Sequence, residues 1–126
     1  MTSASATFLV LDDRIDIDTL GEMAELLQEE FSAVLEAYLE DTNQLMQGAY
    51  GAIANEDMDA LASAAHQIKS SSAYLGMVKL SELAGGLEQR CGEARAEGIG
   101  EIIAELDAEF EFVCEHVMSE FGVELS

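Results

Sequence analysis

The sequence predicts an all-α protein, an antiparallel up-and-down four-helix bundle with an additional short N-terminal helix. The 126 residues include no proline, so long helices can run without interruption. Alanine, leucine, glutamate and methionine are frequent, and all four favour helix. Apolar residues recur at three- and four-residue intervals in successive segments, which must bury these stripes against one another. A chain of this length suits one domain with one core.

The chain divides into a lead-in at residues 1–17 and a helical bundle domain at residues 18–122. We expect the apolar run at residues 8–11 to pack against the main body. The spacing of Thr19 and Glu22 is that of a capping box, which predicts a short helix from near Asp18 to about Gln28. A long helix follows and ends in a turn at residues 55–57, and its apolar stripe is Phe31, Val34, Leu35, Tyr38, Leu45, Met46 and Ile53.

Three further helices complete the predicted bundle. Asp57 is a good N-cap for the next one, which we expect to end around Gly76, where glycine can adopt a left-handed cap. The following helix closes near Gly98, and the last one runs from about residue 100 to residue 121 before Gly122. The apolar stripes of these last two helices are Leu80, Leu83, Leu87, Cys91 and Ala94, then Ile103, Leu106, Phe110, Val113 and Val117.

The composition restricts the kinds of partner and the compartment. A formal net charge of −21 argues against binding to nucleic acid or to an anionic membrane surface. The apolar run at residues 8–11 is too short for a signal core or a membrane span, so we expect a cytoplasmic protein. Cys91 and Cys114 fall on or near apolar stripes and are interpreted as buried small hydrophobes. We expect a monomer, because a bundle of this size can bury its stripes internally.

His66 is the candidate reactive residue. On a helical wheel, it lies about 140° from the centre of the buried face and therefore projects into solvent. The lysine one turn later, Lys69, lies between His66 and the edge of the core. Small neighbours leave the imidazole open to another protein. The residues that define the buried face are Leu61, Ala65, Ile68, Ser72 and Leu75, and the small neighbours on the exposed face are Ala62, Ser63, Ser70 and Ala73.

The segment that contains His66 is almost neutral within a strongly acidic chain. Residues 59–92 hold three acids and three basic residues, whereas the other 23 of the 26 acids lie elsewhere with only Arg14 and Arg95. A phosphoryl group would be repelled almost anywhere else on this surface. The alternative explanation is that the hairpin at 59–92 is simply more buried than the rest.

The segment from His66 to Gly76 resembles the phosphorylation helix of histidine-containing phosphotransfer (HPt) domains, whose pattern is H-x-x-K-G-small-small-x-x-L-G. The stretch at residues 38–41 and the turn at 55–57 are also similar to this family, so the resemblance covers roughly residues 15–120. Ser70 departs from the pattern, because the family most often has glycine there. Serine is still small, so a partner should still be able to dock, while the Ser70 hydroxyl would either increase or decrease selectivity among partners. The matching positions are His66, Lys69, Ser71, Ser72, Leu75 and Gly76.

The resemblance implies a role for each site residue. His66 would be the phosphoacceptor, Lys69 would help to neutralise the phosphoryl group, and Glu88 on the neighbouring helix would orient the imidazole. On the wheel, Glu88 lies at the flank of its helix, where it can face His66. The surface that binds partners would comprise Ala62, Ser63, Ser70, Ala73 and Gly76.

The implied function is transfer of a phosphoryl group from a receiver-domain aspartate to His66 and then to the aspartate of a second receiver. The partners would be receiver domains of response regulators and of a hybrid sensor histidine kinase. The receiver would supply Mg²⁺, so the chain needs no cofactor of its own. No G-x-x-x-x-G-K-[ST] loop is present, which argues against a kinase.

Two alternatives compete with phosphotransfer. The first is an HPt-like interaction module that binds a receiver or a kinase without transfer, although such a module would be expected to lose the histidine that this chain retains. The second is a metal site, which the spacing disfavours. Di-iron bundles use Glu-x-x-His, and the residues three before His66 and His116 are Ser63 and Val113. His116 is interpreted as a surface residue with no role.

Overall fold

The computed structural model describes residues 14–93 and 97–121. Every regular element in these ranges is helical, which confirms the all-α prediction. The elements are α2 (Ile17–Leu27), the short 3₁₀ turn η1 (Gln28–Glu30), α3 (Phe31–Ala54), α4 (Met58–Tyr74), α5 (Val78–Gly92) and α6 (Ile99–Phe121).

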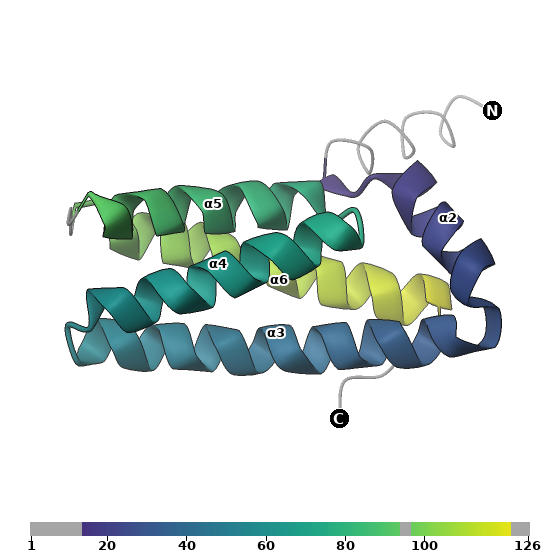
Figure 1. The fold of residues 1–126 in the computed structure, drawn as a ribbon, viewed down its shortest axis with the longest axis horizontal. Coiled ribbons are helices and arrows are strands. Elements are labelled where there is room, and N and C mark those ends of the chain that lie inside the picture. Colours follow the sequence, from purple (N-terminus) through teal and green to yellow (C-terminus); the bar gives the residue numbers. More distant parts are fainter. Residues whose placement is uncertain (1–13, 94–96, 122–126) are drawn as a thin grey trace.

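The four long helices run alternately up and down, as predicted (Figure 1). Each packs on the next one in sequence, and α6 closes the ring by contacting α3. The most extensive packing is between α4 and α5. The short helix α2 lies across the end of the bundle where α3 begins (Figure 1). This arrangement places the predicted phosphorylation helix, α4, between α3 and α5.

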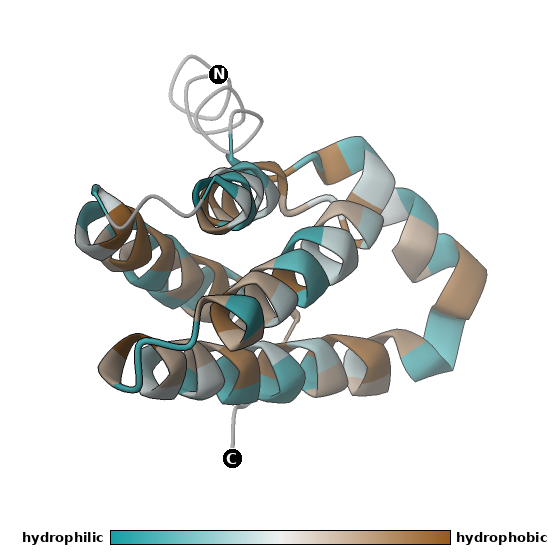
Figure 2. Cartoon of the chain, turned by 60° about the vertical axis from the view of Figure 1, so that its left-hand side comes forward, coloured by the Kyte–Doolittle hydropathy of each residue, from teal (hydrophilic) through white to brown (hydrophobic). Residues whose placement is uncertain are grey.

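The core lies along the facing sides of the four long helices. Hydrophobic and hydrophilic stretches alternate along each helix (Figure 2), as expected for amphipathic helices. Leu39, Ile68, Leu80 and Leu106 are fully buried, and burial of one such side chain contributes about 1.5–3 kcal/mol. Burial of the hydrophobic residues on these stripes therefore fixes the rotation of each helix about its axis.

Ile53 is an exception to the predicted stripe of α3, because 36% of its surface is exposed. It lies on the core-facing side, but in the last turn of the helix, where the neighbouring helices cover it incompletely. There it lines a cavity of about 400 Å³ with Met58 and Ile99. Periodicity therefore predicts the side of α3 on which Ile53 lies, but the prediction that Ile53 is buried is wrong.

The helix ends confirm two of the predicted caps and correct a third. The Asp57 carboxylate accepts a hydrogen bond from the Ala60 amide, 3.0 Å away, and Gly76 has a left-handed backbone with φ +78°. The predicted capping box at Thr19 is wrong. Asp16 caps α2 by accepting hydrogen bonds from both the amide and the hydroxyl of Thr19, so α2 begins at Ile17. A carboxylate is also favoured over a hydroxyl by the positive end of the helix dipole.

Residues 14–17, which belong to the predicted lead-in, are attached to the bundle. The Arg14 guanidinium donates to the Glu109 carboxylate at 2.7 Å and lies over the ring of Phe112, 3.3 Å from its centroid. The Asp16 amide donates to the carbonyl of Gly76 at 2.7 Å. The domain boundary at residue 17 stays a prediction. The apolar run at 8–11, Ala94 and Gly122 lie outside the described residues.

The two cysteines are buried free thiols, as predicted. Burial raises the pKa of Cys91, and it raises the pKa of Cys114 to about 11. Both thiols are therefore protonated at neutral pH and poorly nucleophilic. Within residues 14–93 and 97–121, no helix combines the length and the apolar content that crossing a bilayer requires.

Candidate functional site

Helix α4 presents His66 to solvent from its middle turns. The predicted buried face is confirmed, because Leu61, Ala65 and Ile68 are almost completely covered. The His66 side chain is 58% exposed. Its neighbours Ser63, Ser70 and Ala73 are exposed and Ala62 is half-buried, so the α4 side chains on this exposed face are small.

A buried hydrogen bond helps to fix the rotation of α4. The Tyr38 hydroxyl on α3 lies 2.7 Å from the Ser72 hydroxyl on α4, in the interior between the two helices. Burial raises the pKa of Tyr38, although the hydrogen bond with Ser72 acts in the opposite direction. Ser72 lies on the side of α4 that faces the core, and pairing its hydroxyl there turns His66 outward.

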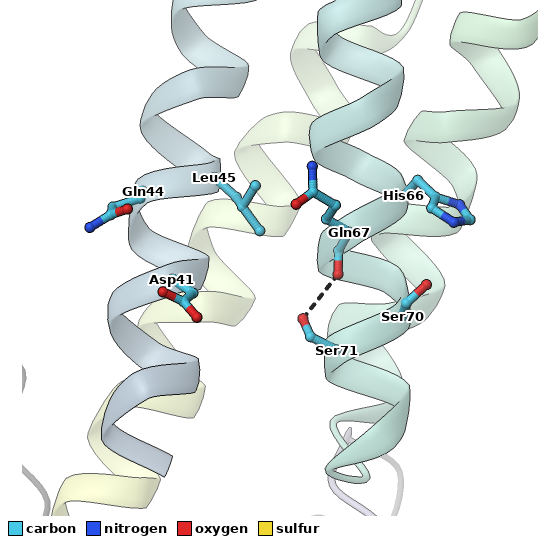
Figure 3. Close-up of a pocket in the computed structure, with 7 residues that line it drawn as sticks. All are labelled: Asp41, Gln44, Leu45, His66, Gln67, Ser70 and Ser71. Atoms are coloured by element: carbon cyan, nitrogen blue, oxygen red, sulfur yellow. Dashed lines mark hydrogen bonds between the residues drawn. The ribbon is translucent and has the colours of Figure 1, made fainter. Parts of the chain in front are cut away.

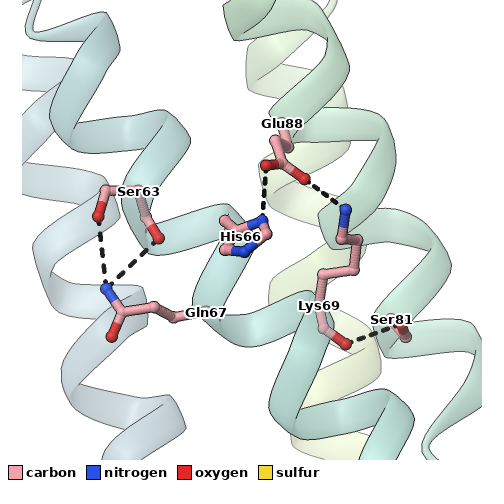
Figure 4. A network of polar contacts seen from close by, with 6 residues as sticks. All are labelled: Ser63, His66, Gln67, Lys69, Ser81 and Glu88. Atoms are coloured by element: carbon pink, nitrogen blue, oxygen red, sulfur yellow. Dashed lines mark hydrogen bonds and ion pairs between the residues drawn. The ribbon is translucent and has the colours of Figure 1, made fainter.

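Glu88 on α5 joins His66 to Lys69. The Oε2 atom of Glu88 lies 2.8 Å from Nδ1 of His66, and its Oε1 atom lies 2.7 Å from Nζ of Lys69 (Figure 4). One carboxylate thus contacts both partners with a different oxygen. The sequence prediction that Glu88 faces His66 is confirmed, but the ion pair between Lys69 and Glu88 was not predicted.

The charges in this cluster determine which ring nitrogen of His66 carries the proton. The hydrogen bond from Lys69 lowers the pKa of Glu88, and His66 adds a smaller effect, whereas partial burial opposes both. The carboxylate is therefore ionised at neutral pH and can only accept a hydrogen bond. A neutral His66 ring must consequently carry its proton on Nδ1, which leaves the lone pair on Nε2. Within the described ranges no hydrogen bond occupies Nε2.

A groove of about 760 Å³ runs beside His66 between α3 and α4. Residues from both helices line it (Figure 3), and the Ser71 hydroxyl donates to the carbonyl of Gln67 at 3.0 Å. Helix α3 therefore contributes to the surface around the imidazole. The lining residues are Asp41, Gln44, Leu45, His66, Gln67, Ser70 and Ser71.

Comparison with known proteins agrees with this geometry. The family model for the Hpt domain matches residues 33–115, a span that includes His66, Lys69 and Glu88. This chain belongs to the HPt domain family. Among solved structures, the chain is similar to histidine-containing phosphotransfer protein B (HptB) from Pseudomonas aeruginosa PAO1, with a TM-score of 0.83 at 22% sequence identity. The match covers 85% of this chain and 93% of that one. A search of curated proteins found no match.

HPt domains have a histidine phosphotransfer role in phosphorelays, and they are phosphocarriers rather than enzymes. Through its family membership, the chain has a histidine phosphotransfer role in phosphorelays. At 22% identity, the likeness to HptB supports the shared helical bundle alone.

Gly76 does not belong to the exposed surface of this HPt domain, contrary to its predicted place among the partner-binding residues. It is buried in the turn after α4, and a Cβ atom there would lie 2.9 Å from the carbonyl oxygen of Asp16. With φ at +78°, the position favours glycine for conformational reasons. Its match to the family pattern therefore reflects the turn, and Gly76 is not part of the exposed surface around His66.

The near-neutral hairpin of residues 59–92 corresponds to α4, α5 and the turn between them. It is not simply a buried hairpin, because His66, Ser63, Ser70 and Ala73 are exposed on it. The hairpin therefore combines an exposed surface around His66 with no net formal charge. Among the described residues, no group of three or more histidine, cysteine, aspartate or glutamate side chains could hold a metal ion.

Sequence reasoning missed the α3 side of this site. Asp41, Gln44 and Leu45 line the groove, yet helical periodicity shows only that they lie on or beside the core-facing side of α3. The signal that could have located them is the predicted packing of α3 on α4, combined with the exposed position of Gln67. His116, which is predicted to be a surface residue with no role, is half-buried and stacks on Phe112 with ring centroids 6.3 Å apart.

Proposed function

We propose that this HPt domain accepts a phosphoryl group on His66 from a receiver-domain aspartate and passes it to the aspartate of another receiver. The observation that carries the proposal is the contact between Nδ1 of His66 and the Glu88 carboxylate at 2.8 Å. This contact holds the proton on Nδ1 and directs the nucleophilic lone pair of Nε2 into solvent. An exposed, correctly protonated imidazole suits attack on a phosphorus atom that another protein presents.

In the first step, the Nε2 lone pair of His66 attacks the phosphorus of an aspartyl phosphate. The new N–P bond forms as the P–O bond to the aspartate breaks, and the bonding electrons leave with the aspartate carboxylate. The ring keeps its proton on Nδ1 and gains positive charge, which the Glu88 carboxylate offsets. In the second step, the carboxylate of the next receiver attacks the same phosphorus and the N–P bond returns its electrons to Nε2.

Phosphoryl transfer depends more on in-line positioning and neutralisation of charge than on acid–base groups. Lys69 places a positive charge one helical turn from His66, and the surrounding hairpin has no net formal charge. We expect the receiver to supply Mg²⁺ together with its acidic pocket. The HPt domain would then need no cofactor of its own and no kinase activity.

The surface around His66 suits docking of one receiver domain at a time. Ser63, Ser70 and Ala73 create no steric barrier, and the groove beside Gln67 and Leu45 adds depth on the α3 side. We propose that receiver domains of a hybrid sensor histidine kinase and of a response regulator both use this surface. The chain would act in the cytoplasm as a monomer, without binding nucleic acid or membrane.

A transfer assay tests this proposal. The purified chain is incubated with a panel of receiver domains that carry aspartyl phosphate, and phosphate on the chain is tested for acid lability and base stability, as expected of phosphohistidine. Wild type should become labelled by at least one receiver, and His66→Gln should remain unlabelled. Label that survives on His66→Gln would contradict the proposal. If receivers bind wild type without labelling it, the chain is instead a non-catalytic interaction module.

A further inference from the structure

One face of α5 carries three residues that lie beside Lys69. Ser81, Gly85 and Glu88 are four and three positions apart, which places them in a row on one side of the helix. The Ser81 hydroxyl donates to the backbone carbonyl of Lys69 at 2.9 Å, and Glu88 receives the ammonium group at 2.7 Å (Figure 4). Lys69 is therefore held by α5 at both its backbone and its charged end.

Gly85 leaves space for the aliphatic part of Lys69. A Cβ atom at position 85 would lie 3.3 Å from Cδ of Lys69 and 3.9 Å from its Cγ. The next residue, Gly86, has nothing within 4 Å of the same hypothetical atom. Of these two adjacent glycines, only Gly85 lies next to the Lys69 side chain, which extends from α4 to Glu88.

The ion pair with Lys69 restrains the carboxylate that His66 contacts. A glutamate side chain has several rotamers, and Glu88 is partly exposed, so its carboxylate can adopt other orientations when it has no partner. With Nζ bound to Oε1, the other oxygen is directed at Nδ1 of His66. Lys69 lowers the pKa of Glu88 more than His66 does, which agrees with Lys69 being the stronger partner of the carboxylate.

We propose that Lys69 is a positioning residue that acts through Glu88, held along a track formed by Ser81, Gly85 and Glu88, and that it thereby keeps the His66 proton on Nδ1. This inference deepens the proposed phosphotransfer function and rests on it for its biological meaning. It differs from the role that the family resemblance implies for Lys69, which is direct neutralisation of the phosphoryl group.

The first test needs no partner protein. In ¹⁵N-histidine-labelled protein at about pH 8.5, where an imidazole is neutral, the ring ¹⁵N shifts report the tautomer of His66. Wild type should hold the proton on Nδ1, while Lys69→Met and Glu88→Ala should both move His66 toward the mixture of tautomers found in free imidazole. Gly85→Ala should move it in the same direction, and the matched control Gly86→Ala should not. A wild-type tautomer in Lys69→Met would overturn the inference.

The second test is a double-mutant cycle on the rate of transfer from a phosphorylated receiver. If Lys69 acts through Glu88, Lys69→Met should slow transfer about tenfold in the wild-type background but less than about twofold when Glu88 is already alanine. An equal loss in both backgrounds would show that Lys69 acts on the phosphoryl group directly and would overturn the inference. Absence of transfer in wild type would refute the proposed function, whereas the tautomer test would still decide the role of Lys69.

Discussion

At the scale of single residues, the orientation of His66 depends on a hydroxyl pair on the opposite side of α4. The Tyr38 and Ser72 hydroxyls meet in the interior, where they form a hydrogen bond with each other. Leaving a buried polar group unsatisfied costs more than the hydrogen bond itself contributes. This pair therefore favours one rotation of α4 over alternatives that apolar packing alone would tolerate.

Tyr38→Phe should lower the free energy of unfolding by about 1–2 kcal/mol at neutral pH, because Ser72 loses its buried partner. The difference in unfolding free energy between wild type and Tyr38→Phe should become smaller above about pH 10, where the tyrosine of the unfolded chain ionises. Burial raises the pKa of Tyr38, so the folded wild type keeps a proton that the unfolded chain releases, and wild type loses stability as pH rises. Urea denaturation at two pH values measures both effects. A deficit that grows in alkali would contradict this explanation.

At the scale of elements, the turn between α4 and α5 connects the site to the N-terminal segment. Gly76 ends α4 with a left-handed backbone, and its carbonyl accepts a hydrogen bond from the amide of Asp16, which caps α2. The turn that aligns α4 with α5 is therefore also the docking point for α2. The position of Glu88 relative to His66 depends on this turn, because it sets the register of the two helices.

Gly76→Ala should destabilise the protein by at least about 2 kcal/mol, from the left-handed backbone together with the close approach to Asp16. Gly86→Ala is the matched control. Its Cβ would meet no neighbour, and alanine should stabilise the interior of α5 by up to about 1 kcal/mol. Chemical denaturation of both variants gives the comparison. Equal stability of the two variants would show that the turn tolerates a side chain.

The helices and the exposure of His66 could be predicted from sequence because both follow from local periodicity. The N-cap at Asp57 and the left-handed turn at Gly76 could also be predicted, because aspartate and glycine are the residue types that favour these positions. The predicted capping box at Thr19 is wrong because Asp16, a stronger capping group three residues earlier, caps α2 instead. The ion pair between Lys69 and Glu88 could not be predicted, since it depends on the distance between two helices and on the path of a long side chain past Gly85.

At the scale of the whole molecule, charge is distributed unevenly. The chain has a formal charge of −21, while residues 59–92 are neutral overall, so the remainder carries the entire excess. Self-repulsion of this kind destabilises a compact state and also repels anionic ligands. The hairpin formed by α4 and α5 has no net formal charge, and His66 lies on it. The family membership and the local charge therefore support the same site.

Raising NaCl from about 20 mM to about 300 mM should stabilise the protein, because salt screens repulsion among exposed acids. A gain of about 1 kcal/mol would raise Tm by about 4 °C for a chain of this size. Differential scanning calorimetry at constant pH measures the change. A Tm that falls with salt would show that ion pairs such as that of Arg14 and Glu109 outweigh the repulsion.

We propose that His66 carries the phosphoryl group on Nε2 because Glu88 holds the proton on Nδ1. The most direct measurement is a ³¹P–¹⁵N correlation spectrum of ¹⁵N-histidine-labelled protein after transfer from a receiver domain. We predict a single phosphorus coupled to Nε2 of His66. Coupling to Nδ1, or to either nitrogen of His116, would show that the phosphoryl group is not carried on Nε2 of His66.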